Sequence, residues 1–373
     1  MSAFTGQVTR VSYLELFFDL VFIFAITVTT VTTATDLTGI DLYRGLLVLA
    51  LLWWAWVGYS WLGTTVRVDE GSMVILFLIA MGAMLVVTVL VPNWYAGDSA
   101  ALLAALAYVG VRVLHLLLFW RVGRGNAELR AATLRLAAGV GVGAVLLITG
   151  AIVGGTAQVV LVTLAVVLDF GGALLGGGRG WVVSIPHFAE RYGLIIIIAL
   201  GEAIIATGIA SISATLTLHV AVPIVIAFAL TAAIWWAYFR SVAGPVEHAI
   251  AAAAPARQPA LARDVYSYLH LLPVIGIFLM ALALKKVIGK VDAKGLLVQL
   301  YDVPAFALGA GVVLILLSLI LMRLRTGTPV PVTAWIGLGI AIIVGALAMT
   351  LPAVLVAAGM FVAIAVAARR PAA

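Results

Sequence analysis

The sequence contains no cysteine and few charged residues. Of its 373 residues, only 10% are Asp, Glu, Lys or Arg, whereas 65% belong to the hydrophobic set AVILMFWYC. Soluble domains carry about 25% charged and 45–50% apolar residues, so an ordinary soluble enzyme, a disordered chain and a nucleic-acid-binding protein are excluded. The missing cysteines exclude disulfides, thiol catalysis and thiolate metal sites. A mean hydropathy of +1.25 instead predicts a polytopic membrane protein in contact with the lipid bilayer.

Motifs for metal or cofactor chemistry are also missing. The chain has no HExxH, no HxxxH and no paired Asp-rich motif, so no metal site is predicted. Gly176–Gly180 lacks the Lys-Ser/Thr of a phosphate-binding loop. All four lysines lie outside the middle of an apolar segment, which excludes a buried Schiff base. We therefore expect no metal, no cofactor and no catalytic residue set.

Long apolar segments are what the sequence does contain. A helix needs about 20 apolar residues to cross about 30 Å of hydrocarbon. The first segment holds Glu15 and Asp19, which favours an uncleaved span over a signal peptide. Leu351 and Pro352 alone separate the last two segments, so a re-entrant pair is an alternative there. The sequence predicts an all-α transmembrane bundle with twelve spans near 13–33, 45–66, 72–92, 100–121, 135–154, 157–176, 188–210, 218–239, 265–285, 303–322, 332–350 and 352–368.

Basic residues are distributed unevenly between these segments. With a cytoplasmic N-terminus, outer segments hold Arg44 and the four lysines of Lys285–Lys294. Loops rich in Arg and Lys stay in the cytoplasm, so we predict that both termini are cytoplasmic. For the lysine segment, an interfacial helix with snorkelling side chains is favoured over a basic outer lip or an error in the span count. The inner segments hold Arg10, Arg67, Arg121, Arg124, Arg130, Arg135, Arg179, Arg191, Arg240, Arg257, Arg263, Arg323, Arg325, Arg369 and Arg370.

The twelve segments divide into two halves, residues 1–178 and 179–373, joined by a Gly-rich linker at 176–186. In the first half, Asp19 precedes a WWA run at Trp53 by 34 residues; in the second, Glu202 precedes a WWA run at Trp235 by 33. This spacing predicts two six-helix repeats of the same orientation, related by an axis normal to the membrane. Coincidence within an interfacial aromatic belt is the alternative. The Ala/Pro-rich stretch 242–264 is predicted as a solvated cytoplasmic linker.

Several ionisable residues lie within the predicted spans, where they are costly and are usually paired or functional. We predict two sets. The first is an ion or proton path made of Asp19, Glu202, Glu15, His187, Glu190 and Arg191. The second is a buried polar network made of Arg112, His115, Asp169 and His270.

The role of each group stays open at this point. Arg112 is always charged and is predicted to be a structural clamp on Asp19, Asp169 or Glu202. His115 is either a hydrogen-bonded core residue or a proton relay. The aromatic residues at positions 53, 54, 56, 59 and 61 could stack on a cation, although a membrane-interface belt is favoured.

Seven short motifs together resemble the bacterial low-temperature-requirement A family. They cover residues 15 to 270, and the resemblance implies a bacterial multi-pass protein of the cytoplasmic membrane. Where many members are expected to have an acid after the sixth motif, this chain has Arg240. The motifs are ELFFDLVF at 15–22, WWAW at 53–56, RVLH at 112–115, HFAER at 187–191, LGE at 200–202, WWAYF at 235–239 and YSYLH at 266–270.

The first helix also resembles, more weakly, the signature of the two-repeat lysosomal-type potassium channels. The similar positions are Glu15, Phe17, Asp19, Val21-Phe22 and Ala25. This resemblance implies a path lined by the first helix of each half. The second half has an acid at the matching place but lacks the flanking phenylalanines.

These observations favour an ion channel or ion-coupled transporter, with a small ion or molecule as its partner and Asp19 and Glu202 as its central groups. An intramembrane enzyme acting on a lipophilic substrate, with His187, Glu190 and Glu202 as acid and base, is the alternative. A non-catalytic stress-response scaffold with every buried charge paired is the third hypothesis. A homo-oligomer is compatible with each of them.

Overall fold

The computed structural model describes residues 10–369 apart from residues 176, 177, 179, 182, 213 and 216. Regular structure in this part of the chain is helical, with one isolated bridge between Gln299 and Pro352. The predicted all-α class is confirmed. The helices of the first part are α1 (Tyr13–Ala34), α2 (Gly39–Thr65), α3 (Ser72–Leu90), η1 (Val91–Asn93), α4 (Ser99–Val122), α5 (Ala127–Val153), α6 (Gly155–Leu175) and α7 (Ile185–Ile212). They are followed by α8 (Leu218–Trp236), η2 (Ala237–Ala243), α9 (Gly244–Ala251), η3 (Pro255–Arg257), α10 (Gln258–Ala262), η4 (Arg263–Leu269), α11 (Leu271–Lys294), α12 (Asp302–Thr326), α13 (Val332–Ala346) and α14 (Ala353–Ala367).

Helix length and hydropathy identify a polytopic membrane protein. Among the described residues, ten helical runs are long and apolar enough to cross a membrane, and the apolar helices α13 and α14 are shorter. The 15 residues of each short helix extend about 22 Å, against about 30 Å of hydrocarbon. This length fits the alternative of a re-entrant pair as well as the two predicted spans. Each of the twelve predicted segments therefore corresponds to a helix.

The chain folds as two compact units. The first unit comprises Met1–Thr32, Tyr43–Arg191 and Ala254–Arg263, and the second comprises Thr33–Leu42, Tyr192–Ala253 and Asp264–Ala373. Helix α7 begins in the first unit and continues in the second. The repeat boundary at 178/179 and the symmetry between the halves stay predictions, and part of the predicted linker 176–186 lies outside the described residues.

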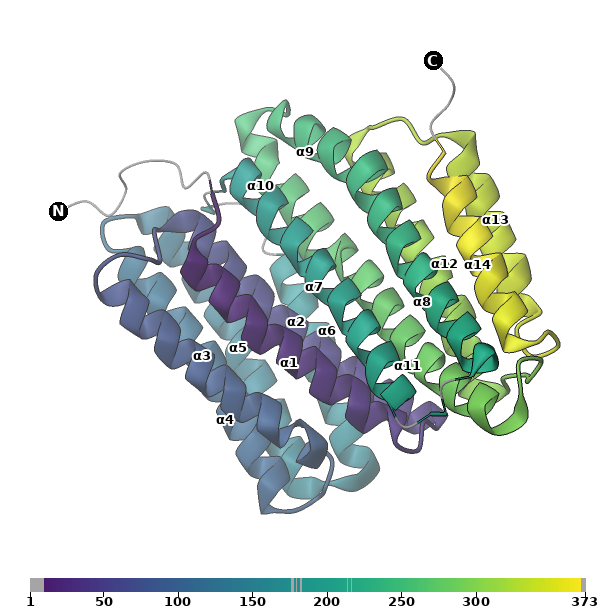
Figure 1. Cartoon of the computed structure of the whole chain (residues 1–373). Coiled ribbons are helices and arrows are strands. Elements are labelled where there is room, and N and C mark those ends of the chain that lie inside the picture. Colours follow the sequence, from purple (N-terminus) through teal and green to yellow (C-terminus); the bar gives the residue numbers. More distant parts are fainter. Residues whose placement is uncertain are drawn as a thin grey trace. The chain divides into compact units, whose positions relative to one another are not determined.

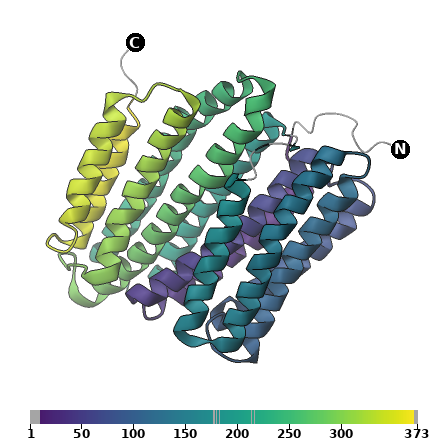
Figure 2. The ribbon, with the colours of Figure 1, turned by 180° about the vertical axis from the view of Figure 1, so that it is seen from behind.

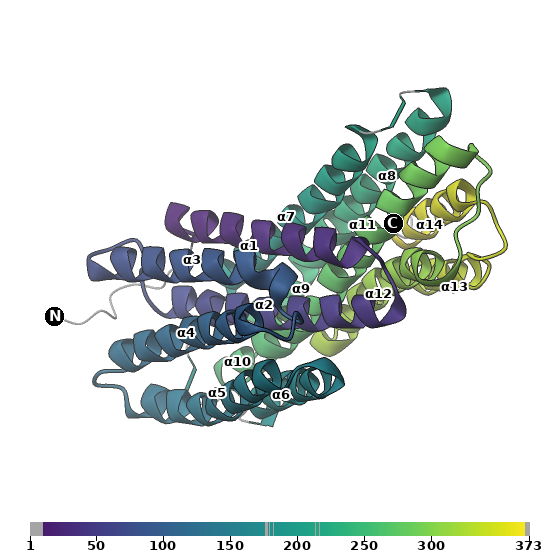
Figure 3. The ribbon, with the colours of Figure 1, turned by 90° about the horizontal axis from the view of Figure 1, so that it is seen from below.

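Helix α2 forms the core of the first unit. Its most apolar window is 89% buried, and Figure 3 shows α2 between α1 on one side and α5 and α6 on the other. Two tyrosines connect α2 and α4 in opposite directions. Tyr59 donates to the Val111 carbonyl at 3.0 Å, and Tyr108 donates to the Leu51 carbonyl at 3.0 Å. These two bonds fix the axial position of α2 against α4.

The aromatic residues of α2 belong to this core. Trp53, Trp54, Trp56, Tyr59 and Trp61 are all buried. The prediction of a membrane-interface belt is therefore wrong for this helix, because neighbouring helices cover the rings that a belt would expose.

Glycines allow the helices of the second unit to approach closely. A Cβ on Gly276 of α11 would lie 2.5 Å from the Gly311 carbonyl oxygen of α12, and a Cβ on Gly311 would lie 2.7 Å from the Gly276 carbonyl oxygen. Between α12 and α13, a Cβ on Gly309 would lie 2.9 Å from Cα of Gly345. These helices are the green to yellow ribbons of Figure 2. Small residues at such contacts are typical of membrane helices, which associate without a hydrophobic driving force.

Residues 242–264 are mostly helical, so the predicted loop has regular structure, while its exposure to the cytoplasm stays a prediction. A π-helical segment, η2, leads into α9, and η3, α10 and η4 continue the chain to α11 (Figure 1). Alanine is the strongest helix former, and Pro245 stands in the first turn of α9, where proline is tolerated. Val246 and Ile250 are buried, so α9 packs one of its faces.

The four lysines lie in the last turns of α11, which continues to Lys294. The predicted span, by contrast, ended at residue 285. The helical interpretation of this segment therefore holds, while the side of the membrane on which the lysines lie stays a prediction.

Candidate functional site

Helix α1 begins with a capping box that sequence analysis missed. The Ser12 hydroxyl accepts a hydrogen bond from the Glu15 backbone N–H at 3.3 Å, and the Ser12 N–H donates to Oε2 of Glu15 at 3.0 Å. This Ser-x-x-Glu pairing satisfies two backbone donors at the start of the helix. It also positions the Glu15 carboxylate at the first turn of α1.

Four side chains of the first unit form a buried ionic cluster, here called the α1–α7 cluster. Helices α1 and α7 each contribute two of them at i, i+4: Glu15 and Asp19, and His187 and Arg191. Nη1 of Arg191 lies 2.6 Å from Oε1 of Glu15, and its Nη2 lies 3.1 Å from Oδ1 of Asp19. Nε2 of His187 lies 3.1 Å from Oε1 of Glu15. All four residues are at most 1% exposed.

Helix α2 supplies the second set of contacts to the cluster. Trp56 donates its indole N–H to Oδ1 of Asp19 at 2.7 Å, and Nε of Arg191 donates to the Ser60 hydroxyl at 3.0 Å. Cζ of Arg191 lies 5.6 Å from the centroid of the Trp56 ring. The α2 aromatics were predicted as possible partners of a cation, and the cation that Trp56 contacts is the side chain of Arg191.

Gly63 of α2 leaves the space that the Glu15 carboxylate occupies. A Cβ at Gly63 would lie 2.1 Å from Oε1 of Glu15 and 3.6 Å from Cε1 of His187. Alanine at this position would therefore displace the carboxylate from Arg191. Gly63 stands at i+7 from Trp56, so both lie on the face of α2 that contacts the cluster.

We expect Gly63→Ala to lower the free energy of unfolding by about 1–3 kcal/mol, because overpacking forces buried groups to move. Unfolding of the purified protein in SDS-containing mixed micelles measures this change. Gly82→Ala on α3 is the matched control, since a Cβ there meets nothing within 4 Å. Equal stability of the two variants would contradict the expectation.

The α1–α7 cluster contains two carboxylates and one guanidinium. Nδ1 of His187 is buried and has no hydrogen-bond partner among the described residues, whereas Nε2 lies at the Glu15 carboxylate. A hydrogen on Nε2 fits this geometry, because a carboxylate can only accept. With a neutral His187 the cluster has one excess negative charge, so a single proton makes it neutral.

Asp19 offers a place for that proton. Its Oδ1 accepts hydrogen bonds from Trp56 and Arg191. Its Oδ2 is buried and without a hydrogen-bond partner in the described part of the chain. A proton on Oδ2 would therefore displace neither existing donor.

A second buried ion pair connects α4 and α6. Nη2 of Arg112 lies 3.0 Å from Oδ2 and 3.2 Å from Oδ1 of Asp169. Of the three predicted partners of Arg112, the structure therefore selects Asp169 and not Asp19 or Glu202. One cation faces one anion here, so this pair is already balanced.

His115 lies in an aromatic environment on α4. Its ring centroid is 4.9 Å from that of Phe119 and 5.4 Å from that of Tyr59. A Cβ on Gly58 would lie 2.8 Å from Nε2 of His115, so the missing side chain at Gly58 leaves the space that the His115 ring occupies. This packing favours a core residue over a proton relay.

Two predicted path residues on α7 lie outside the ion pairs of the cluster. Oε2 of Glu190 accepts from the Val11 backbone N–H at 3.0 Å and so fastens the segment before α1. Glu202 is buried and belongs to the second unit. It stands eleven residues after Arg191, about 16 Å of α-helix.

His270 is hydrogen bonded within the second unit. Its Nδ1 donates to the Val265 carbonyl at 2.8 Å, and its Nε2 accepts from the Tyr238 hydroxyl at 2.8 Å. The carbonyl can only accept, so it fixes a hydrogen on Nδ1. His270 therefore connects the π-helical segments η2 and η4.

The sequence identified the four ionisable members of the cluster, and Trp56 as one of five aromatics that could contact a cation, but not Ser12, Ser60 and Gly63. The Ser-x-x-Glu spacing was a readable signal for Ser12. Trp56, Ser60 and Gly63 stand at i, i+4 and i+7, which marks one face of a helix. Within the described residues, no three acidic or histidine side chains are arranged to hold a metal ion.

Comparison with known proteins agrees with this architecture. Residues 10–369 match the model of a family described as bacterial low temperature requirement A protein. The chain is also similar to an uncharacterized protein of Rhizobium meliloti (strain 1021), with 29% identity over 282 residues that cover 72% of this chain and 67% of the relative. No solved structure matches the chain. These comparisons give no support to the resemblance between the first helix and the two-repeat potassium channels.

Proposed function

The chain belongs to the bacterial low temperature requirement A family, and from this premise we propose that it is an ion-coupled membrane transporter whose coupling ion is a proton. The proton would bind in the α1–α7 cluster. The observation that carries the proposal is the excess of one carboxylate in that cluster, together with the unpartnered Oδ2 of Asp19.

Charge balance supports a proton as the coupling ion. A net charge inside a membrane protein is costly, and a single proton removes it from this cluster. Arg191 already occupies the space between Glu15 and Asp19, so a metal cation would meet a fixed positive charge there. A proton on Asp19 needs no additional space.

Protonation would change how α1 holds α7. A neutral Asp19 binds the Arg191 guanidinium more weakly than the carboxylate does, because ionic hydrogen bonds are roughly twice as strong as neutral ones. Arg191 then remains attached mainly through Glu15 and Ser60. Two protonation states thus favour two arrangements of these helices, which is the requirement for coupling.

The Arg112–Asp169 pair takes a structural role in this proposal. Its charges are balanced, and it connects α4 and α6 within the same unit. Glu202 is the further carboxylate of the proposed path, and Glu190 lies near its cytoplasmic end. The arginine distribution supports this orientation, with both termini in the cytoplasm.

Reconstitution in liposomes tests the proposal. We expect proton flux through the wild type under an imposed potential, read with an enclosed pH-sensitive dye, and at least a tenfold loss in Asp19→Asn. Glu202→Gln and the double variant are measured beside it, and potassium flux is recorded in parallel. Glu70→Gln is the control, because this carboxylate pairs with Arg67 at the surface and lies outside the cluster.

Three outcomes would contradict the proposal. Proton flux that persists in Asp19→Asn would remove the cluster from the path, and potassium flux without proton flux would favour a channel. A wild type without flux under any gradient would favour the scaffold or the intramembrane enzyme. The internal ion pairs of Arg112 and Arg191 support the scaffold.

A further inference from the structure

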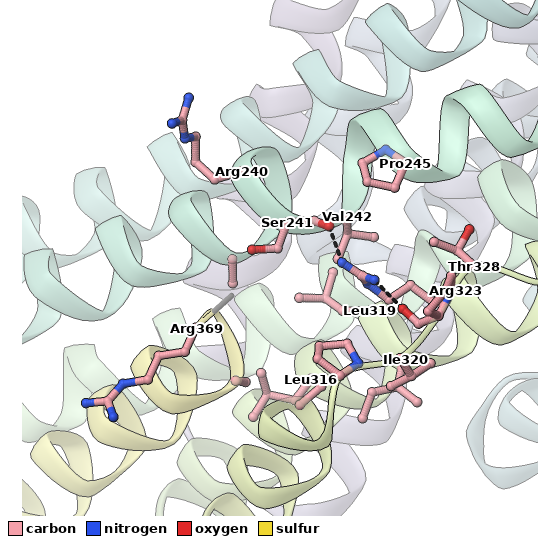
Figure 4. A pocket seen from close by; sticks show the side chains of 16 residues that line it. Arg240, Ser241, Val242, Pro245, Leu316, Leu319, Ile320, Arg323, Thr328 and Arg369 are labelled. Atoms are coloured by element: carbon pink, nitrogen blue, oxygen red, sulfur yellow. Dashed lines mark hydrogen bonds between the residues drawn. The ribbon is translucent and has the colours of Figure 1, made fainter. Parts of the chain in front are cut away.

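The helical run that begins with α8 and ends with α9 is irregular at η2, in the second unit. Sharp bends in helices arise at prolines, at Gly/Ser pairs, at π-helical turns, or where a side chain inserts into the backbone hydrogen bonds. The π-helical η2 contains Ser241 and is followed directly by Gly244 and Pro245. Arg323 of α12 adds the inserted side chain (Figure 4). All four causes of a bend are therefore present at residues 241–245.

Arg323 supplies a hydrogen bond that the backbone cannot make. In an α-helix the Ser241 carbonyl would accept from the backbone nitrogen of residue 245, but this residue is Pro245, which has no N–H. The guanidinium of Arg323 donates to the Ser241 carbonyl oxygen through Nη2 and to the Pro329 carbonyl oxygen through Nη1 (Figure 4). Arg323 therefore connects η2 to the segment between α12 and α13.

The pocket beside this connection leaves space for η2 to move. It measures about 580 Å³, and its lining includes Val242 of η2 and the apolar residues Leu316, Leu319 and Ile320 of α12. Protein interiors are close-packed, so helices normally have no free space of this size beside them. Leu319 lines the pocket but is only 7% exposed. A change in the position of η2 would therefore uncover side chains that are now buried.

Ser241 has one further connection, and it is the weaker one. Its hydroxyl donates to the Ala368 carbonyl oxygen, after α14, at 3.4 Å, which is long for a hydrogen bond between two oxygens. A hydrogen bond from a charged donor is roughly twice as strong as one between neutral groups. The bond from Arg323 is therefore the main polar contact that holds Ser241 in place.

We propose that residues 241–245 form a hinge between α8 and α9, and that Arg323 holds this hinge closed over the pocket. When Arg323 releases the Ser241 carbonyl, η2 and α9 move away from α12 and the pocket opens. Hinges consist of a few residues at the ends of elements, and these are often small, as Ser241, Ala243 and Gly244 are. The hinge belongs to the second unit alone and does not depend on the proton site of the first.

Reaction of an introduced thiol tests the proposal, because the sequence contains no cysteine. We expect Leu319→Cys in the purified full-length protein to react slowly with N-ethylmaleimide, since this position is buried in the closed pocket. Adding Arg323→Met is expected to raise the reaction rate at least tenfold, because methionine cannot donate to the Ser241 carbonyl. Leu308→Cys is the control: it is buried on the same helix, is not among the residues that line the pocket, and is expected to stay slow in both backgrounds.

Restoring the backbone donor distinguishes this hinge from a general loss of packing. Pro245→Ala supplies an N–H that can donate to the Ser241 carbonyl. In that background we expect Arg323→Met to change the reaction rate of Leu319→Cys by less than threefold. The other contacts of Arg323 are lost in both backgrounds, so the difference between them measures the contact with Ser241 alone.

Three results would overturn the proposal. An unchanged rate in Arg323→Met would show that Arg323 does not hold the pocket closed. A tenfold increase that persists with Pro245→Ala would mean that Arg323 acts through another contact. An equal increase in Arg325→Gln, which removes a neighbouring arginine paired with Asp264 at 2.6 Å, would show that any loss of charge at this end of α12 has the same effect.

Rapid reaction of Leu308→Cys would indicate that Arg323→Met unfolds the protein. Arg323→Lys then takes its place, because it keeps the charge but replaces the two donating nitrogens with one. We expect a severalfold increase in the reaction rate of Leu319→Cys in this variant, and an unchanged rate would equally contradict the hinge.

Discussion

Replacing Arg191 with glutamine is expected to lower the free energy of unfolding by about 3–5 kcal/mol, the cost of removing one partner from a buried ion pair. Two carboxylates, Glu15 and Asp19, would then remain buried without a cation, although both are at most 1% exposed. Unfolding in SDS-containing mixed micelles measures the change. We expect the folded yield in membranes to fall as well.

Neutralising the carboxylates separates the effect of charge from the effect of lost packing. Combining Arg191→Gln with Glu15→Gln and Asp19→Asn is expected to restore part of the stability, because no uncompensated charge remains. Arg325→Gln is the control: its ion pair with Asp264 is partly exposed and contributes about 1 kcal/mol or less. If Arg191→Gln costs no more than Arg325→Gln, the α1–α7 cluster is not an electrostatic unit.

Replacing Gly276 with leucine is expected to cost about 3 kcal/mol or more, at the upper end of overpacking effects. The Cβ alone would lie 2.5 Å from the Gly311 carbonyl oxygen. The Gly311 carbonyl belongs to the backbone of α12 and cannot rotate away from the new side chain, so α11 and α12 must separate. The same unfolding experiment measures the loss, and a larger apparent size in detergent is expected to accompany it.

Gly289→Leu on the same helix is the matched control. A Cβ at Gly289 meets nothing within 4 Å, and leucine is a better helix former than glycine. We expect this variant to be as stable as the wild type or slightly more stable. Comparable losses in both variants would mean that helix propensity or insertion, rather than the close contact of α11 and α12, determines the effect.

The membrane class and the helical segments could be predicted from the sequence because they depend on local composition. A run of about 20 apolar residues is visible without any knowledge of its neighbours. The sequence also shows that Glu15 and Asp19 lie on one face of a helix, and that His187 and Arg191 lie on one face of another, since i, i+4 spacing is a property of a single helix. Their motifs also carried the family resemblance that the comparison confirmed.

The remaining features depend on which helix faces which. The local sequence does not show whether Arg112 pairs with Asp169 or with Asp19. These acids lie on different helices, and either carboxylate could balance the charge of Arg112. The WWA runs make the same point. Trp53 is buried, whereas Trp235 is 41% exposed, although local sequence and spacing are nearly identical. Close contacts of glycines such as Gly276 and Gly311 require distances that no sequence pattern supplies.

The two π-helical segments, η2 and η4, have a consequence for rotational phase. An α-helix turns about 100° for each residue, and a π-helical turn accommodates one additional residue. Side chains after η2 are therefore rotated about the helix axis, relative to those before η2, by an angle that a continuous α-helix would not give. Because His270 connects η2 to η4 through Tyr238, the phases of the two helical runs are locked to each other. An insertion or deletion in either segment would turn the side chains of the helix that follows it, α9 or α11, toward different neighbours, even where hydropathy is preserved.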